Sequence, residues 1–258
     1  MIKLNRSKKK VSVVMPFFRK KEFFEEAYNS VLNQSYLNIE IIIIYDDHDR
    51  GQLNFVQNII KKSNTIIIIN KKNRGASYSR NIGIKKSKGY YVAFLDCDDI
   101  WHRNKLEEQI NFMEKFQLDC TCTNYSVINK NGNILYRLST PAISTYQSLL
   151  KSCDIGLSTV VIKKKLFNHF KFQNLLTKED YLMWLNISKK GININSIQKT
   201  LVLWRDVKGS LSSNFIQRVK DSFKIYYYHE KQFLFQSIIS IVILSLNSFK
   251  KKIKRFYL

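Results

Sequence analysis

Two clusters of carboxylates are the residues of this chain best suited to chemistry. Asp46–Asp49 (DDHD) and Asp96–Asp99 (DCDD) each follow an apolar run directly. Carboxylates this close repel one another and raise each other's pKa, and a cation between them relieves the repulsion. Hard oxygen ligands suit Mg²⁺ or Mn²⁺, which usually keep water and take up phosphate oxygens. The clusters therefore predict a divalent-metal site that handles phosphate groups, against the alternative of two solvated polar loops.

Two arginines lie where they could bind phosphate. Gly75 allows a tight turn before a predicted helix, and Arg74 and Arg80 lie on either side of the start of that helix. A guanidinium group can donate two parallel hydrogen bonds to a phosphate. The N-terminus of the helix adds a partial positive charge. The alternative for Arg80 is a surface ion pair.

The elements that must position these residues alternate along the first hundred positions. Near-continuous apolar strands separated by helices are typical of a mostly parallel sheet covered on both faces. Ligands of such sheets bind beyond the carboxyl ends of the strands, so we expect both acidic clusters at neighbouring strand ends. The expected strands are Val11–Phe18, Ile39–Tyr45, Thr65–Ile69 and Tyr90–Leu95, and the expected helices are Glu22–Gln34, Leu53–Lys62 and Ala76–Lys86.

The second half of the chain is less regular. Asn131-Gly132 between two apolar runs predicts a hairpin. Two helix starts have capping signals: a Ser-x-x-Gln box at Ser144 and an N-cap at Thr177. The expected helices are Arg103–Phe116, Ser144–Lys151, Thr177–Lys189 and the chain from Asn214 onward, and the expected extended segments are Cys120–Ile128, Ile134–Leu138, Gly156–Ile162 and Ile192–Arg205.

The order of these motifs resembles that of family 2 glycosyltransferases of the GT-A fold, from Val11 to about Ser213. The resemblance is carried by VSVVMPFFRKKEFFEEAYNSVLNQSYLNIEIIIIYDD and NRGASYSRNIGIKKSKGYYVAFLDCDDIW. It implies an α/β fold, with a Rossmann-like, mostly parallel sheet flanked by helices, over residues 1–213. The nucleotide-binding half is expected at about 11–100 and the acceptor-binding half at about 101–213.

The resemblance implies a donor site at the strand ends. In that family the paired Asp residues hold the nucleobase and ribose of a nucleotide-sugar, which points to Asp47 with Asp46 beside it. Pro16 corresponds to a residue that lines the base pocket. The family's D-x-D motif matches Asp96-Cys97-Asp98. Asp96 is expected to contact the ribose or a metal-bound water. Asp98 is then the direct ligand of Mg²⁺ or Mn²⁺.

The resemblance also implies a catalytic base. The family's Glu-Asp motif, whose Asp takes the acceptor proton, matches Glu179 and Asp180, some eighty residues after the D-x-D motif. General bases of this kind must lie within hydrogen-bond reach of the proton that they remove. Thr177 and Asp180 also fit a capping box, so a helix cap is the alternative role for Asp180.

A late segment of the chain departs from the family pattern. The family's Arg-x-His-x-x-Ser-x-Ser motif matches residues 205–213, but Val207 stands where the His is expected. A role for that His in binding metal or diphosphate cannot be carried over. Arg205 or Lys208 is expected to supply the positive charge at the donor instead.

These residues together imply a metal-assisted single displacement with inversion. The donor is a nucleotide-sugar, most simply a UDP-sugar, and the acceptor a hydroxyl of a glycan or lipid-linked glycan in cell-surface polysaccharide biosynthesis. A nucleotidyltransferase on a similar sheet is one alternative, but Pro16–Arg19 (PFFR) replaces the Gly-rich loop expected after its first strand. A nucleic-acid-binding module is another, without an RRM or helix-turn-helix signature to support it. We therefore expect no nucleic-acid partner.

Composition sets the limits of these hypotheses. The chain has 258 residues, of which 45% are hydrophobic and 24% charged, and these are ordinary globular values. They exclude disordered, collagen-like and multi-span membrane proteins. Four cysteines without a C-x-x-C pair make a structural zinc site improbable. The net charge of +23 implies an anionic partner, such as a membrane surface or a phosphorylated substrate.

The C-terminal residues 214–258 are expected to form a basic helical tail. Phe233–Phe249 carries no charge and is followed by Lys250, Lys251, Lys252, Lys254 and Arg255. Three interpretations remain open: a helix packed on the domain, an interfacial helix with a basic anchor, and a short membrane span. Met1–Lys10 does not read as a signal peptide. We expect a cytoplasmic enzyme held peripherally on the inner face of the cytoplasmic membrane.

Overall fold

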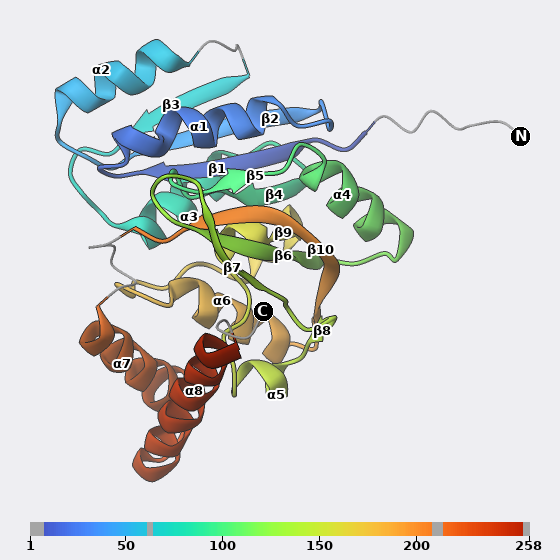
Figure 1. Ribbon diagram of the computed structural model, residues 1–258, viewed down its shortest axis with the longest axis vertical. Coiled ribbons are helices and arrows are strands. Elements are labelled where there is room, and N and C mark those ends of the chain that lie inside the picture. Colours follow the sequence, from blue (N-terminus) through green and yellow to red (C-terminus); the bar gives the residue numbers. More distant parts are fainter. Residues whose placement is uncertain (1–7, 61–63, 208–213, 255–258) are drawn as a thin grey trace, which may run out of the picture.

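The central feature is a ten-stranded sheet, counted over the residues that the computed structural model describes, namely 8–60, 64–207 and 214–254. Its order is β3-β2-β1-β4-β9-β6-β10-β5, with β7 paired to β6 and β8 to β10 (Figure 1). The strands are β1 (Val11–Phe17), β2 (Ile39–Tyr45), β3 (Thr65–Ile69), β4 (Tyr91–Phe94), β5 (Ile100–Trp101), β6 (Cys120–Ile128), β7 (Ile134–Leu138), β8 (Ile143–Ser144), β9 (Val161–Lys163) and β10 (Ile194–Arg205).

Helices cover both faces of this sheet. Side chains alternate across a strand, so β1 contributes Val13 to a core under α1, α2 and α4, and Val14 to a core under α3 and α6. The helices are α1 (Lys21–Leu32), α2 (Arg50–Ile59), α3 (Ala76–Lys86), α4 (Lys105–Lys115), α5 (Tyr146–Leu149), α6 (Glu179–Lys189), α7 (Phe215–Phe223) and α8 (Leu234–Lys254), with short 3₁₀ turns η1 (Leu157–Thr159) and η2 (Lys164–Asn168) and a π-helix η4 (Lys224–His229).

The sheet is parallel in one half and mixed in the other. Strands β3, β2, β1 and β4 run parallel, as the alternation of strands and helices predicts. Strand β9 runs antiparallel to both of its neighbours, β4 and β6, although β6 and β10 are parallel. The expectation of a mostly parallel sheet is therefore right only for the first half. The predicted strand Gly156–Ile162 is split, because η1 precedes β9.

The two acidic clusters lie on strand ends that are not neighbours. The first follows β2 and the second lies beyond β4, and β1 separates these strands. The expectation of neighbouring strand ends is corrected accordingly. Parallel pairing of β1 with both strands still brings the clusters to the same edge of the sheet.

Two helix starts differ from the prediction. Thr145 rather than Ser144 caps α5, because its side chain accepts from the Ser148 amide and its own amide donates to Ser148 Oγ. Ser144 belongs to β8 instead. Thr177 does not cap α6, whose N-cap position is Lys178 in the left-handed region at φ 62°.

The C-terminal tail packs on α6 and shares its core. Ile225 and Tyr226 of η4 and Leu244 of α8 belong to the same buried cluster as the apolar residues of α6. The Tyr226 hydroxyl donates to the Leu150 carbonyl at 2.8 Å and pairs with the Tyr181 hydroxyl at 3.0 Å. In the part of the chain that is described, no helix has the length and apolar character that a membrane crossing requires.

Candidate active site

Asp99 holds the turn that follows β4. Its carboxylate accepts the Ser158 hydroxyl at 2.5 Å and the Arg205 amide at 3.0 Å. Ser158 Oγ in turn accepts the amide of Asp96 at 3.3 Å. Burial, with the neighbouring Asp98 and Asp96 charges, raises the pKa of Asp99 well above its usual range. The segment from Asp96 to Asp99 is therefore fixed from behind by η1 and β10.

Asp98 presents its carboxylate to Lys20. Lys20 Nζ lies 2.6 Å from Asp98 Oδ2, and both side chains are largely buried. Burial raises the pKa of Asp98, while the Lys20 ammonium opposes that rise. Lys20 precedes α1 directly, so the loop after β1 reaches across to the end of β4. The Lys20 ammonium thus balances the charge of this carboxylate in the structure.

Arg80 connects the D-x-D segment with the Glu-Asp segment. Its Nη2 donates to Asp96 Oδ1 at 2.8 Å, and its Nη1 donates to Glu179 Oε1. The side chain is buried, with the whole residue only 4% exposed. In the structure both donors face carboxylates, so Arg80 forms an ion pair that is buried rather than on the surface, and its contact with a donor phosphate stays a prediction.

Asp180 lies in the first turn of α6 and forms no capping box with Thr177. Its Oδ1 accepts the amide of the next residue, Tyr181, at 2.7 Å. Thr177, the expected partner in a capping box, donates its hydroxyl to Asp221 at 3.0 Å instead. The capping box that was the alternative role for Asp180 is therefore absent from the structure.

The pKa of Asp180 suits proton transfer near neutral pH. Burial raises it to about 7, with a further contribution from Glu179, while the Arg80 guanidinium lowers it. A carboxyl group with a pKa near the working pH can both take and hold a proton. Perturbed carboxylates of this kind concentrate at functional sites.

The carboxylate of Asp46, which follows β2, accepts hydrogen bonds from neighbouring loops and is not directed into solvent. Asp46 accepts the amides of Arg74 and Gly75 at 2.9 and 2.8 Å, and Asn70 Nδ2 at 2.7 Å. Gly75 has φ 83°, a conformation that side chains other than glycine rarely adopt. Asp46 thereby shapes the turn before α3.

Asp47, Pro16 and Arg74 lie around the same strand ends. Asp47 accepts the His48 amide at 2.7 Å and the Arg19 amide at 3.3 Å. Pro16 is partly exposed, and its carbonyl accepts the Cys97 thiol at 3.3 Å. The exposed Arg74 guanidinium lies 4.3 Å from the Tyr78 ring centroid, where it is accessible to an anion.

Arg205 supports the site from inside the protein. Its guanidinium donates to the Asp98 carbonyl at 2.9 Å, to the Lys130 carbonyl at 2.8 Å and to Glu26 at 2.5 Å. These partners hold the Arg205 guanidinium behind the D-x-D segment, and its expected contact with the donor stays a prediction. Val207 is partly buried, and Lys208 and the rest of the late motif to position 213 lie outside the described residues.

Sequence reasoning missed the partners that hold the predicted residues. Glu179 was visible as part of the Glu-Asp motif, but its ion pair with Arg80 spans 99 positions. Lys20 pairs with Asp98 across 78 positions, and Ser158 reaches Asp99 across 59. No spacing within a single helix or strand encodes contacts of this length. Only the fold brings these groups together.

The donor set at the end of β4 fits Mg²⁺ or Mn²⁺. Asp96 and Asp98 offer hard oxygen ligands, and a metal ion at Asp98 would take the place of the Lys20 ammonium that lies against its Oδ2. Among the described residues no set of three or more His, Cys, Asp or Glu side chains converges as a metal cage. Mg²⁺ typically uses one or two carboxylates and completes its shell with water and substrate phosphate.

The fold is the GT-A fold. TarS 1–349 of S. aureus, solved with UDP-GlcNAc, matches with a TM-score of 0.67 at 18% identity, over 84% of this chain and 66% of that one. The mannosyltransferase PcManGT from Pyrobaculum calidifontis, solved with GDP-Man and Mn²⁺, matches with a TM-score of 0.67 at 13% identity, over 88% of this chain and 66% of that one.

Sequence comparison identifies the family. The family model of glycosyl transferase family 2 matches residues 12–176. A relative from Escherichia coli is 36% identical over 212 residues, which are 81% of this chain and 82% of that protein. It is named UDP-Glc:alpha-D-GlcNAc-diphosphoundecaprenol beta-1,3-glucosyltransferase WfgD. The chain belongs to glycosyl transferase family 2 and is a glycosyltransferase.

Proposed function

We propose that this enzyme transfers a hexose from a UDP-sugar to a hydroxyl of a lipid-linked glycan, with inversion at the anomeric carbon. The observation that carries the proposal is the double ion pair of Arg80, because it brings the D-x-D carboxylate Asp96 and the Glu-Asp segment of Glu179 to one site. A transferase needs its leaving-group site and its base on either side of the same anomeric carbon.

Asp180 is the proposed base. It removes the proton from the acceptor hydroxyl as the hydroxyl oxygen attacks the anomeric carbon. The bond from that carbon to the UDP oxygen breaks, and UDP leaves with the electron pair. A pKa of about 7 keeps a large fraction of Asp180 ionised at neutral pH. With one base and no second carboxylate assigned as nucleophile, a single displacement inverts the configuration.

The strand ends are the proposed donor site. Asp47 and Pro16 would bind the nucleoside, and Arg74, the exposed guanidinium of the pair predicted to bind phosphate, would meet the diphosphate. Asp98, with Asp96 beside it, would hold Mg²⁺ or Mn²⁺, which when bound neutralises charge on the departing diphosphate. The Mn²⁺ in the PcManGT structure supports this proposal without testing it in this chain.

The acceptor class is suggested by the relative WfgD, whose name specifies UDP-Glc and a sugar diphosphoundecaprenol. An acceptor of that class is amphiphilic, with its reacting sugar in water and its chain in a membrane. We therefore place the reaction in cell-surface polysaccharide biosynthesis, at the inner face of the cytoplasmic membrane. The basic composition of the chain, at +23, suits the diphosphate of such an acceptor.

A donor screen tests the proposal. The purified full chain is incubated with UDP-glucose, UDP-GlcNAc, UDP-galactose or GDP-mannose and a water-soluble, short-chain GlcNAc-diphosphoprenol, with Mn²⁺ or with EDTA. We expect one UDP-hexose to yield an acceptor that is one hexose heavier by mass spectrometry, and only with metal. Glu25→Gln, which alters an exposed carboxylate of α1, is the matched control and retains activity. Absence of transfer from every donor by folded protein contradicts the proposal.

A further inference from the structure

Helix α8 has one face that packs on the protein. Ser237 and Leu244 are buried, and Ile241 is packed against the cluster under α6. Asn247 Nδ2 donates to the Lys151 carbonyl at 2.8 Å, and Ser240 donates to the Gln232 side chain at 2.9 Å. These residues recur at helical spacing, so they lie along one side of α8. The interpretation of the tail as a packed helix is therefore right for this side.

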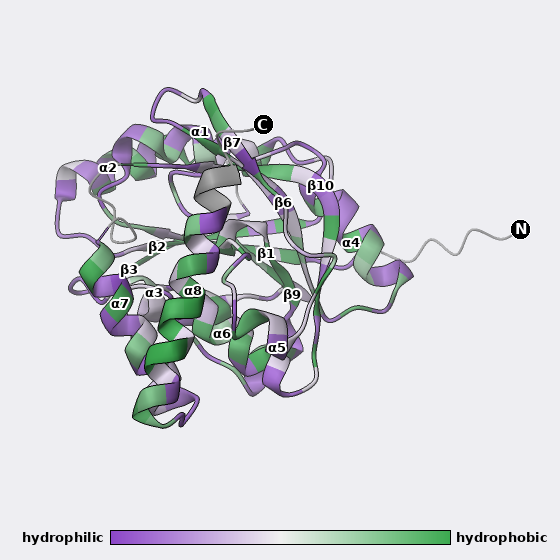
Figure 2. Ribbon diagram, turned by 60° about the horizontal axis from the view of Figure 1, so that its bottom comes forward, coloured by the Kyte–Doolittle hydropathy of each residue, from purple (hydrophilic) through white to green (hydrophobic). Residues whose placement is uncertain are grey.

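The opposite side of α8 is apolar and exposed, and we name it the outer stripe. Figure 2 shows hydrophobic turns over much of this helix. An amphipathic surface helix ordinarily turns polar residues outward, and α8 does the reverse. Exposed apolar area of this extent marks an interaction site. The outer stripe consists of Phe235, Ile238, Ile239, Val242, Leu246 and Phe249.

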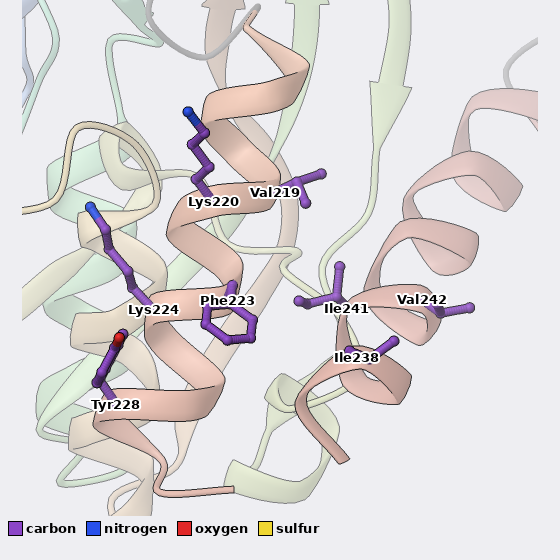
Figure 3. Close-up of a pocket in the computed structure, with 8 residues that line it drawn as sticks. All are labelled: Val219, Lys220, Phe223, Lys224, Tyr228, Ile238, Ile241 and Val242. Carbon is purple, nitrogen blue, oxygen red and sulfur yellow. The ribbon is translucent and has the colours of Figure 1, made fainter. Parts of the chain in front are cut away.

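The stripe continues into a groove between α8 and the preceding helices. The groove has a volume of about 570 Å³. Val219 and Phe223 of α7 project toward Ile241 of α8 across it (Figure 3). Lys220 and Lys224 line the same groove. Figure 3 shows their ammonium ends directed away from α8, so the lysines border the apolar groove on its α7 side.

We propose that the outer stripe and this groove dock onto an anionic lipid bilayer, with α8 lying in the plane of the interface. Lys250–Lys254 form the last turns of α8, so basic residues follow the apolar stripe on one helix. Interfacial helices combine these two features. Each lysine near an anionic surface strengthens binding by roughly fivefold. The inference goes beyond the proposed function, because it assigns a surface outside the catalytic site.

Charge distinguishes a bilayer from a second copy of this chain as the occupant. Each chain carries a net charge of +23, so two copies meeting on a lysine-rich face repel one another. An anionic bilayer neutralises the same charge. The helix of 21 residues would extend about 30 Å along the membrane. A flat, extended partner matches an exposed stripe of that length better than a single isoprenoid chain in the groove does.

The docking surface is tied directly to the base. Asp221 of α7 accepts the amide and the hydroxyl of Thr177, at 2.9 and 3.0 Å. Thr177 lies three positions before Asp180 in the chain. Tyr181, the residue after Asp180, pairs its hydroxyl with that of Tyr226 at 3.0 Å. Membrane contact through α7 and α8 therefore sets the position of α6, and with it Asp180, relative to the bilayer surface.

Sedimentation with vesicles tests this inference. The full chain is mixed with vesicles of phosphatidylglycerol and phosphatidylethanolamine, or of phosphatidylcholine alone. We expect binding to the anionic vesicles that exceeds binding to the neutral ones by at least about tenfold, as several lysines acting together require. The triple variant Ile239→Glu, Val242→Glu and Leu246→Glu should lose at least about tenfold of this binding, because it places carboxylates in the stripe.

A matched control separates the stripe from general charge. Leu37→Glu, Phe116→Glu and Ile134→Glu make the same charge change at exposed apolar positions elsewhere. This control should keep most of the anionic vesicle binding. All affected side chains are exposed, so both variants should fold, and circular dichroism and transfer to the water-soluble acceptor check this independently of vesicle binding.

Three outcomes overturn the inference. One is a full chain that ignores anionic vesicles. Another is a stripe variant that binds anionic vesicles as well as the control variant does, because scattered lysines would then account for the binding. The third is a full chain that is dimeric by analytical ultracentrifugation and becomes monomeric in the stripe variant, which makes this face a contact between copies. None of these depends on whether the sugar transfer proposed above occurs.

Discussion

Arg80 Nη2 lies 2.8 Å from Asp96 Oδ1, and Nη1 of the same guanidinium donates to Glu179 Oε1. One buried cation therefore pairs with two carboxylates, the one that starts the D-x-D segment and the one beside the proposed base. Buried ion pairs of this kind are costly to break from one side, because the remaining charges lose their partner. The arrangement makes Arg80 a positioning residue for both halves of the site.

Arg80→Gln should move the acid limb of the pH profile upward. In the native protein the guanidinium lowers the pKa of Asp180, which stands at about 7. Its removal raises that pKa, so the loss of kcat/KM on acidification begins at a higher pH. Arg80→Lys keeps the charge and should shift the limb less. An unmoved limb with a raised donor KM would instead support the phosphate contact predicted from the sequence.

Asp180→Asn should lower kcat by roughly 10²–10⁴, the usual contribution of a general base, with donor affinity nearly unchanged. Steady-state kinetics and a donor thermal-shift titration measure the two effects separately. Glu25→Gln, at an exposed carboxylate of α1, is the control and should keep native turnover. Collapse of donor binding along with turnover in the Asp180 variant would contradict the assignment.

The same Asp180 substitution should also raise thermal stability above neutral pH. The folded pKa of Asp180, about 7, lies above its unfolded value, so folding favours the protonated form. The cost of ionising the group is absent at low pH and fully present above the folded pKa. The melting temperature of the variant should therefore exceed that of the native chain at pH 8, and exceed it by less at pH 5. A lower melting temperature at both pH values would show a structural role.

Asp98→Asn should abolish metal-dependent transfer while the fold persists. The substitution removes one anionic ligand from a site that must balance the charge of a diphosphate. Activity is measured across a Mn²⁺ titration, and circular dichroism checks the fold. Full activity of the variant, or of the native chain in excess EDTA, rules out the metal assignment.

Ser158→Ala should lower the free energy of unfolding by about 1–3 kcal/mol, because the buried Asp99 carboxyl loses the hydroxyl donor on Oδ2 and keeps only the Arg205 amide on Oδ1. Ser77→Ala is the matched control. Ser77 is also buried, but its hydroxyl has no hydrogen-bond partner in the structure, so its loss should change stability by less than about 0.5 kcal/mol. Chemical denaturation measures both. Equal effects would mean that the Asp99 contact contributes nothing specific.

The first half of the fold was predictable because its signals are local. The runs IEIIIIY and TIIII predict β2 and β3 at the observed bounds, Ile39–Tyr45 and Thr65–Ile69. Near-continuous apolar strands between helices also predict parallel pairing. The antiparallel β9 was not predictable in this way, because its direction depends on where η1 and the preceding loop return the chain.

The roles of charged residues were less predictable than their positions. Asp46, Arg80 and Arg205 all lie at or near the strand ends, as expected, yet each is held by partners from within the protein. The sequence shows which side chains bear charge, but the choice between a ligand and a protein partner depends on long-range packing. The choice of Thr145 over Ser144 as a cap has the same origin, because pairing of Ser144 with Ile194 in the sheet decides it.

The anomeric configuration of the product tests the central claim most directly. The native chain is supplied with its UDP-hexose, metal and the water-soluble GlcNAc-diphosphoprenol, and the new linkage is determined by NMR, with Asp180→Asn run in parallel. A base-assisted single displacement predicts that an α-linked UDP-hexose gives a β-linked product, and that the variant gives little of it. A product with retained α configuration, or equal yields from both proteins, would contradict the account.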